Sequence, residues 1–142
     1  MKTRLLTALA LFAVGNALAT SLYWDANGTD ANTGTTAPGT WGTDTFWNDS
    51  STGTGGTLTA TTTSADDLFF SSGTNYTGTF TVTLNGNQNG RSLTVEEGSV
   101  TLVGGAANVP TSGTTINAGA TLQVGDGGTT GSVSGSIVNN GT

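Results

Sequence analysis

A short pattern recurs towards the end of the chain at an almost constant interval. Val95-Glu96-Glu97-Gly98, Ile116-Asn117-Ala118-Gly119 and Val138-Asn139-Asn140-Gly141 each contain a β-branched residue, two polar or small residues and a glycine. Their first positions lie 21 and 22 residues apart (116 − 95 and 138 − 116). A fixed period of this size is typical of a solenoid, in which each turn buries its apolar side chains only against neighbouring turns. The repeat therefore favours a stacked architecture.

The residues between the glycines indicate that the repeating unit is made of strands. Segments 93–95, 100–102 and 122–124 each read apolar, polar, apolar. This alternation is typical of a strand with one buried face. A glycine between two strands can adopt the positive φ of a sharp corner, and we assign this structural role to Gly98, Gly119 and Gly141. The succession of strand, corner, strand and loop predicts an all-β fold, a parallel β-helix.

Hairpins are the main alternative to stacked coils. The loop 85–90 carries two Asn-Gly pairs, and residues 96–99 could join two antiparallel strands. Such hairpins would produce an antiparallel β-sandwich. A sandwich gives no reason for a constant spacing, so the spacing favours the β-helix.

The composition fits a β structure with a polar surface. The 142 residues, enough for one domain, include 31 threonines and 23 glycines. Charged residues make up 8% of the chain, well below the ~25% usual in globular proteins. Disordered chains that are poor in aliphatic residues usually carry a high charge, and this chain does not. We therefore expect an ordered fold.

The chain begins with the three parts of a secretory signal peptide. Lys2 and Arg4 form a basic segment, residues 5–14 an apolar segment, and Ala17-Leu18-Ala19 a cleavage site. The apolar segment is too short for a spanning helix, which needs about 20 residues. We predict that residues 1–19 are a signal peptide and that the protein is exported to the extracellular space or the outer cell surface. We expect no membrane span elsewhere in the chain.

The charge of the remaining chain excludes one class of partner. Removal of residues 1–19 leaves 123 residues (142 − 19), with Arg91 as the one basic residue against nine acids and a net charge of −8. Binding to nucleic-acid phosphates requires clustered lysine and arginine. We therefore expect no nucleic-acid partner.

All three tryptophans lie in an aromatic, turn-rich segment, residues 20–65. A β-helix exposes the end of its core before the first coil and needs a terminal cap there. Because Trp24, Trp41 and Trp47 lie between glycine loops and beside the first strands, we predict that this segment is the cap. The alternative is an exposed platform on which sugar rings stack.

Residues 66–142 are then the solenoid coils. Their pattern stops after Gly141, so we expect further coils of the same polypeptide downstream.

Residues 114–125, with Thr101-Leu102 upstream, resemble the autotransporter-associated β-strand repeat of bacterial surface passenger proteins. Segments 24–28 and 41–48 are similar to the starts of such proteins. The loop 108–113 departs from the Thr-Tyr-Thr-Gly element that is usual in the repeat. The resemblance implies a secreted or surface-displayed, right-handed β-helix, and it implies no catalytic residues.

The residues themselves offer little catalytic chemistry. The chain has no histidine and no cysteine, which excludes a Ser-His-Asp triad and imidazole or thiolate metal sites. Two acidic pairs occur, Asp66-Asp67 and Glu96-Glu97. Neighbours in a strand point to opposite faces, so we predict that neither pair can hold a glycoside between two carboxylates. We expect both pairs to be solvated corner residues.

Calcium is the one metal that the loops could attract, through oxygen ligands. The acids that could supply them are Asp25, Asp30, Asp44 and Asp49. Their spacing matches no calcium-binding loop, and the segment 125–128 resembles a calcium-binding nonapeptide only once. We therefore predict no metal site and no cofactor.

Two functions remain open. The first is a non-catalytic structural or adhesive surface passenger, which could bind an extracellular glycan or another surface ligand. The second is the amino-terminal part of a β-helical enzyme that binds or degrades polysaccharide. The lack of a catalytic signature favours the first, so we predict that the chain is not an enzyme.

Overall fold

The structure, a computed structural model, describes residues 18–74 and 76–142. Most of the predicted signal peptide, residues 1–17, lies outside the described residues. The described part contains strands joined by turns and no helix, and hence no helix that could cross a membrane.

Three sheets build the molecule. Sheet A contains β4 (Leu58–Thr59), β3 (Trp47–Asn48), β1 (Ser21–Trp24), β5 (Asp67–Phe70), β8 (Ser92–Val95), β11 (Gly113–Ile116) and β14 (Ile137–Asn139), here in reverse spatial order. Sheet B contains β2 (Gly39–Trp41), β6 (Thr79–Leu84), β9 (Ser99–Gly104) and β12 (Thr121–Val124). Sheet C contains β7 (Gln88–Asn89), β10 (Ala106–Asn108) and β13 (Ser132–Val133).

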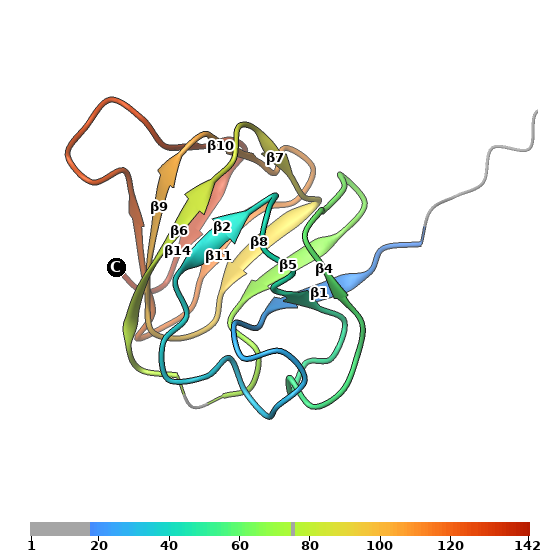
Figure 1. The fold of residues 1–142 in the computed structure, drawn as a ribbon. Coiled ribbons are helices and arrows are strands. Elements are labelled where there is room, and N and C mark those ends of the chain that lie inside the picture. Colours follow the sequence, from blue (N-terminus) through green and yellow to red (C-terminus); the bar gives the residue numbers. More distant parts are fainter. Residues whose placement is uncertain (1–17, 75) are drawn as a thin grey trace, which may run out of the picture.

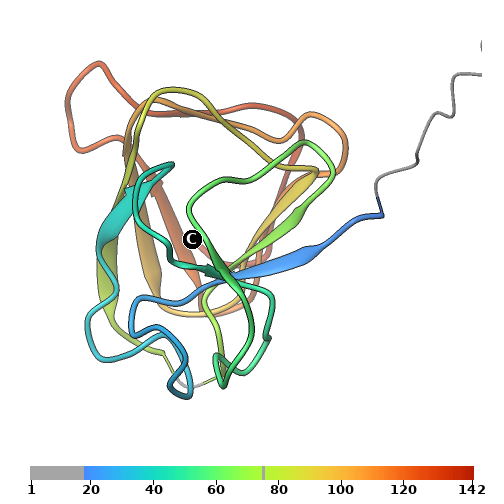
Figure 2. The same cartoon turned by 45° about the vertical axis from the view of Figure 1, so that its right-hand side comes forward.

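The chain visits the three sheets in turn and forms a β-solenoid of about three turns. The first complete coil is β5–β6–β7, the second is β8–β9–β10, and the third is β11–β12–β13. β14 then pairs with β11. Figure 1 shows the coils side by side, and the turned view in Figure 2 shows their three-sided outline.

The strand pairing confirms the β-helix and excludes the β-sandwich. Strand β8 pairs in parallel with β5 and β11, and β9 pairs in parallel with β6 and β12. The hairpin considered across residues 96–99 is therefore absent, because β8 and β9 belong to different sheets. Antiparallel pairing in the described residues is confined to β1–β3 and β3–β4.

The parallel stack begins earlier in the chain than residue 66. β1 pairs in parallel with β5, and β2 pairs in parallel with β6. The segment 20–65 therefore contributes strands to sheets A and B, and its long loops lie at the end of the stack (Figure 1).

The predicted alignment of the third repeat is wrong by one residue. Ile116 pairs with Asn139, whereas Val138 pairs with Thr115. Equivalent positions in sheet A are Leu68, Leu93, Thr114 and Ile137, at intervals of 25, 21 and 23 residues (93 − 68, 114 − 93 and 137 − 114). The strands keep their register while the turns and loops between them differ in length, so the coil length is not constant.

The predicted alternation places the core correctly in the inner coils. In β6, the apolar side chains are buried and the three threonines between them are exposed. Eight apolar residues on the strands of these coils are buried: Phe80, Val82, Leu84, Leu93, Val95, Val100, Leu102 and Ile116.

The apolar residues at the end of the stack are more exposed than those of the inner coils. Val124 is 42% exposed and Ile137 is 54% exposed, and Leu122 and Val133 are half-buried. These strands have a parallel neighbour on one side only. The alternation identified the right positions, but burial also requires a coil on each side.

The three corner glycines serve two different purposes. Gly98 and Gly119 have φ values of +67° and +84°, which a side chain would strain. Gly141 has no such φ. A Cβ there would lie 2.3 Å from the carbonyl oxygen of Ala120, so this position needs a glycine for close packing.

Candidate functional site

The tryptophans form a buried aromatic cluster at the start of the stack. Trp24, Trp41 and Trp47 are each fully buried. The Trp47 ring centroid lies 5.1 Å from those of both other tryptophans and 5.3 Å from that of Phe70 on β5. No tryptophan ring face is therefore available for stacking on a sugar, and the cluster covers the core of the first coil.

A surface depression lies instead where the loops of residues 27–35 and 49–56 meet the turns 71–74, 76–78 and 96–98. Three adjoining hollows of about 500, 360 and 230 Å³ make it up. Asn32 lines the first two, Tyr76 the first and third, and Glu96 the second and third. We call this depression the corner groove. Its principal polar and aromatic lining residues are Tyr23, Asn27, Asn32, Ser51, Thr52, Thr54, Tyr76, Thr77, Glu96 and Glu97.

Backbone hydrogen bonds hold the walls of the groove together. The Asn32 amide nitrogen donates to the Thr52 carbonyl over 2.8 Å, and the Gly73 nitrogen donates to the Ser51 carbonyl over 2.8 Å. Asn32 has a φ of +66°, a conformation that asparagine tolerates better than most residues. A Cβ at Gly73 would lie 2.1 Å from the Asn32 Oδ1, so glycine is required for this packing.

Tyr23 gives the groove one rigid aromatic edge. Its ring stacks on Phe69 of the next strand, with the centroids 4.7 Å apart and the planes at 16°. Both residues are half-buried on the outer side of sheet A. Stacking against a neighbouring coil restricts the position of the Tyr23 ring.

The two adjacent glutamates share one hollow, contrary to the prediction from strand alternation. Glu96 and Glu97 follow β8 in the corner, where alternation does not apply, and both line the smallest hollow. The Glu97 Oε1 accepts hydrogen bonds from the Tyr76 nitrogen over 3.0 Å and from the Ser71 hydroxyl over 3.2 Å. Burial raises the pKa of the Glu96 carboxyl, and the charge of Glu97 raises it further.

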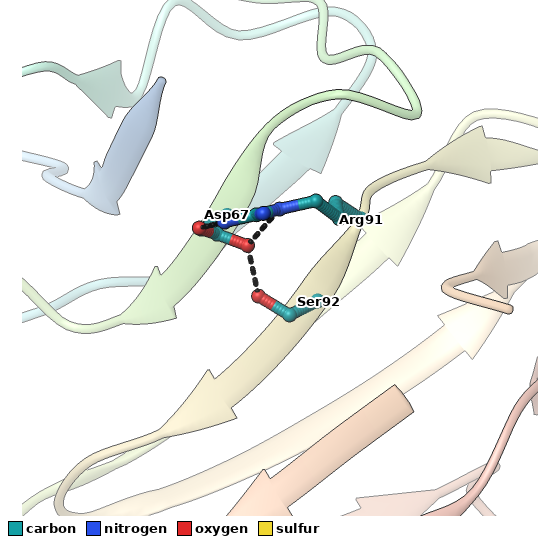
Figure 3. A network of polar contacts seen from close by, with 3 residues as sticks. All are labelled: Asp67, Arg91 and Ser92. Carbon is teal, nitrogen blue, oxygen red and sulfur yellow. Dashed lines mark hydrogen bonds and ion pairs between the residues drawn. The ribbon is translucent and has the colours of Figure 1, made fainter. Parts of the chain in front are cut away.

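Asp66 and Asp67 have separate structural roles and are not solvated corner residues. Asp66 is buried, and its Oδ2 accepts hydrogen bonds from the Thr63 nitrogen over 2.7 Å and from the Thr63 hydroxyl over 2.8 Å. Asp67, on β5, accepts hydrogen bonds from Arg91 and Ser92 on the next coil (Figure 3). The hydrogen bonds from Arg91 are the main reason why the pKa of Asp67 is lowered.

We expect the Asp67→Asn variant to be less stable than the unchanged protein at pH 7 and equally stable at strongly acidic pH. The lowered pKa of Asp67 stabilises the fold above the unfolded-state pKa of about 3.9, and this contribution disappears as the pH falls through the folded-state value. Denaturant unfolding between pH 7 and pH 2 would measure the difference. A constant difference between the two proteins over this range would contradict the assignment.

A second polar cluster joins the loops that follow β1 and β3. Asp25 and Asn48 are both fully buried. The Asn48 Nδ2 lies 2.8 Å from the Asp25 Oδ2 and within 3.3 Å of three carbonyl oxygens, those of Gly28, Gly53 and Gly55. Burial raises the pKa of the Asp25 carboxyl, although the hydrogen bond from Asn48 opposes this rise.

The other acids considered for calcium do not gather with Asp25 as a carboxylate cluster. The Asp44 Oδ2 accepts a hydrogen bond from the Thr40 nitrogen over 2.7 Å, and the Asp49 Oδ1 accepts one from the Thr57 nitrogen over 2.8 Å. Nowhere in residues 18–74 and 76–142 do three acidic side chains form a metal-binding group.

Sequence reasoning missed the corner groove because its walls come from four separate segments of the chain. Only the stacking of β1 on β5 and β8, together with the loops of the cap, brings together Tyr23, Asn32, Thr52 and Glu96.

Comparisons with protein-family models, with curated proteins and with solved structures found no match to this chain.

Proposed function

We propose that this chain belongs to a non-catalytic, secreted or surface-displayed protein with a structural and adhesive role, and that the corner groove binds an extracellular glycan. The observation that carries the proposal is the lining of the groove. It combines hydroxyl, carboxamide and carboxylate groups with two tyrosines, and its lining residues include no lysine or arginine. Sugars present many hydroxyl groups and some apolar C–H faces, which these groups can recognise.

Three further features support the proposal. The predicted signal peptide would direct the chain out of the cell. The exposed threonines of β6 give sheet B an uncharged, polar outer surface. The groove walls are fixed by stacked rings and backbone hydrogen bonds, so a ligand would lose little free energy in ordering them.

Glycan-array binding of residues 20–142, followed by titration of the best glycan, tests the proposal. We expect Glu96→Gln to weaken binding about 10-fold, because a hydrogen bond to a charged acceptor contributes about 1.5–3 kcal/mol. Asn32→Gly keeps the positive φ and removes the carboxamide, so it should also weaken binding. Thr81→Ala, on the exposed face of sheet B, is the matched control and should bind normally.

Two outcomes would contradict the glycan proposal. The first is a folded protein that binds no glycan on the array. The second is equal affinity in Glu96→Gln, Asn32→Gly and Thr81→Ala, because the glycan would then bind elsewhere.

One observation favours a second function, hydrolysis of polysaccharide. Glu96 and Glu97 line one hollow, and the raised pKa of Glu96 is a property of a general acid. Against this, the Glu97 Oε1 already accepts two hydrogen bonds from the protein. Release of reducing ends from the bound glycan, abolished in Glu96→Gln, would establish this second function in place of the first.

A further inference from the structure

Asparagine is followed directly by glycine at four places in the chain, at Asn27, Asn85, Asn89 and Asn140. Such a pair can deamidate without an enzyme, because glycine has no side chain to hinder its own backbone nitrogen. That nitrogen loses its proton and attacks the asparagine Cγ. The N–Cγ bond forms, the Cγ–Nδ2 bond breaks, and ammonia leaves, so that a succinimide ring remains. Water then opens the ring to aspartate or to isoaspartate, whose main chain runs through the Cγ and is longer.

Two of the four glycine nitrogens are held by hydrogen bonds. The Gly90 nitrogen donates to the Asn108 carbonyl over 3.0 Å, and Gly90 is buried. The Gly141 nitrogen donates to the Asn139 Oδ1 over 3.0 Å. A bonded nitrogen must be released before it can attack. The structure therefore protects both of these pairs.

The other two glycine nitrogens, those of Gly28 and Gly86, donate no hydrogen bond within residues 18–74 and 76–142. Their surroundings differ. Gly28 is half-buried, and its carbonyl accepts a hydrogen bond from the Asn48 amide over 3.3 Å. Asn85 and Gly86 are both exposed, in the turn that joins β6 to β7. Buried neighbours therefore do not obstruct the approach of the Gly86 nitrogen to the Asn85 side chain.

We propose that Asn85 is a self-modification site, the first asparagine of the folded protein to deamidate, and that the reaction loosens this turn. The Asn85 Nδ2 donates to the Thr43 hydroxyl over 3.1 Å, and this donor leaves as ammonia. The next coil packs tightly on the turn, since a Cβ at Gly105 would overlap the Gly86 carbonyl oxygen. A longer main chain therefore disturbs contacts on both sides. The site is separate from the corner groove and does not depend on glycan binding.

Ageing of residues 20–142 at mildly alkaline pH, followed by peptide mass spectrometry, tests the proposal. The fraction of each asparagine that is converted gives four rates from one sample. Asn85 should react at least about 5-fold faster than Asn89, where a hydrogen bond must first break. In denaturing urea the four rates should become similar, because the same residue pair occurs at each position. The aged protein should have a lower Tm than the fresh protein.

Asn85→Gln is the matched control. Glutamine forms the corresponding larger ring much more slowly, so ageing should leave residue 85 and the Tm unaltered, with the other three rates unchanged. Faster reaction at Asn27, Asn89 or Asn140 than at Asn85 in the folded protein would overturn the proposal. Equal relative rates in folded and urea-denatured protein would overturn it too, because the structure would then not select the site. An equal loss of Tm in Asn85→Gln and the unchanged protein would overturn the assigned effect on the turn.

Discussion

Replacing Trp47 by alanine should lower the free energy of unfolding by about 3–5 kcal/mol, the usual effect of deleting a large buried aromatic side chain. The Trp47 ring lies at the centre of the aromatic cluster, in contact with Trp24, Trp41 and Phe70. Its removal would leave a cavity between the cap and the first coil. Urea unfolding followed by circular dichroism measures the change. A loss below about 1 kcal/mol would contradict the assigned role of the cluster.

A pair of phenylalanine variants separates packing from hydrogen bonding. The Trp24 Nε1 donates to the Ala37 carbonyl over 2.8 Å, whereas the Trp47 Nε1 is buried without a partner. Trp24→Phe therefore removes a hydrogen bond and leaves a buried carbonyl unpaired, but Trp47→Phe removes a group that was already unpaired. Trp24→Phe should be the more destabilising by about 1 kcal/mol. The reverse order would show that packing alone decides these positions.

Leu93→Ala should lower the free energy of unfolding by about 2–5 kcal/mol, while Ile137→Ala should change it by less than about 0.5 kcal/mol. The two residues occupy equivalent inward positions in sheet A, with Thr114 between them. Leu93 is fully buried between two coils, whereas Ile137 is 54% exposed on the last strand. The contrast therefore isolates the contribution of a stacked neighbour on each side.

Urea unfolding of the two variants measures this difference, and Val138→Ala is the matched control. Val138 is as exposed as Ile137, at 53%, but pairs with Thr115 on the outward column. It should behave like Ile137→Ala. Similar large losses in all three variants would contradict the exposed position of β14.

The fold class could be predicted from the sequence because two independent patterns agree. Alternation between apolar residues and threonine identifies strands, and recurrence of corner glycines indicates that these strands stack. In β6 this reasoning also places every side chain on the correct face. Both patterns lie within short segments of the sequence, so they can be recognised without knowledge of the tertiary contacts.

The register of the last repeat could not be predicted in the same way. Matching Val138 to Ile116 assumed that each coil has the same length, but the coils differ by up to four residues (25 − 21). The loop 125–131 after β12 shows how a coil lengthens without disturbing its strands; in Figure 1 it projects from the stack. Hydrogen bonding between coils determines the register, and a single sequence does not display it.

The candidate sites were less predictable than the fold. Glu96 and Glu97 were expected at a corner, but strand alternation was still used to argue that they cannot face one ligand; because β8 ends at Val95, alternation does not apply to them. The Asp25 cluster depends on backbone carbonyls of glycines, which carry no side-chain signal. Residues that supply their main chain to a site leave no chemical pattern in the sequence.

The parallel register between β6, β9 and β12 distinguishes the solenoid from a hairpin fold, and backbone nuclear Overhauser contacts measure it directly. Residues 20–142 should show contacts around the aligned pairs Thr81–Thr101 and Thr101–Gln123. The same spectra should lack a backbone contact between Thr94 and Thr101, since these residues lie in different sheets. A Thr94–Thr101 contact, with none between Thr81 and Thr101, would show a hairpin across residues 96–99 and would contradict the solenoid.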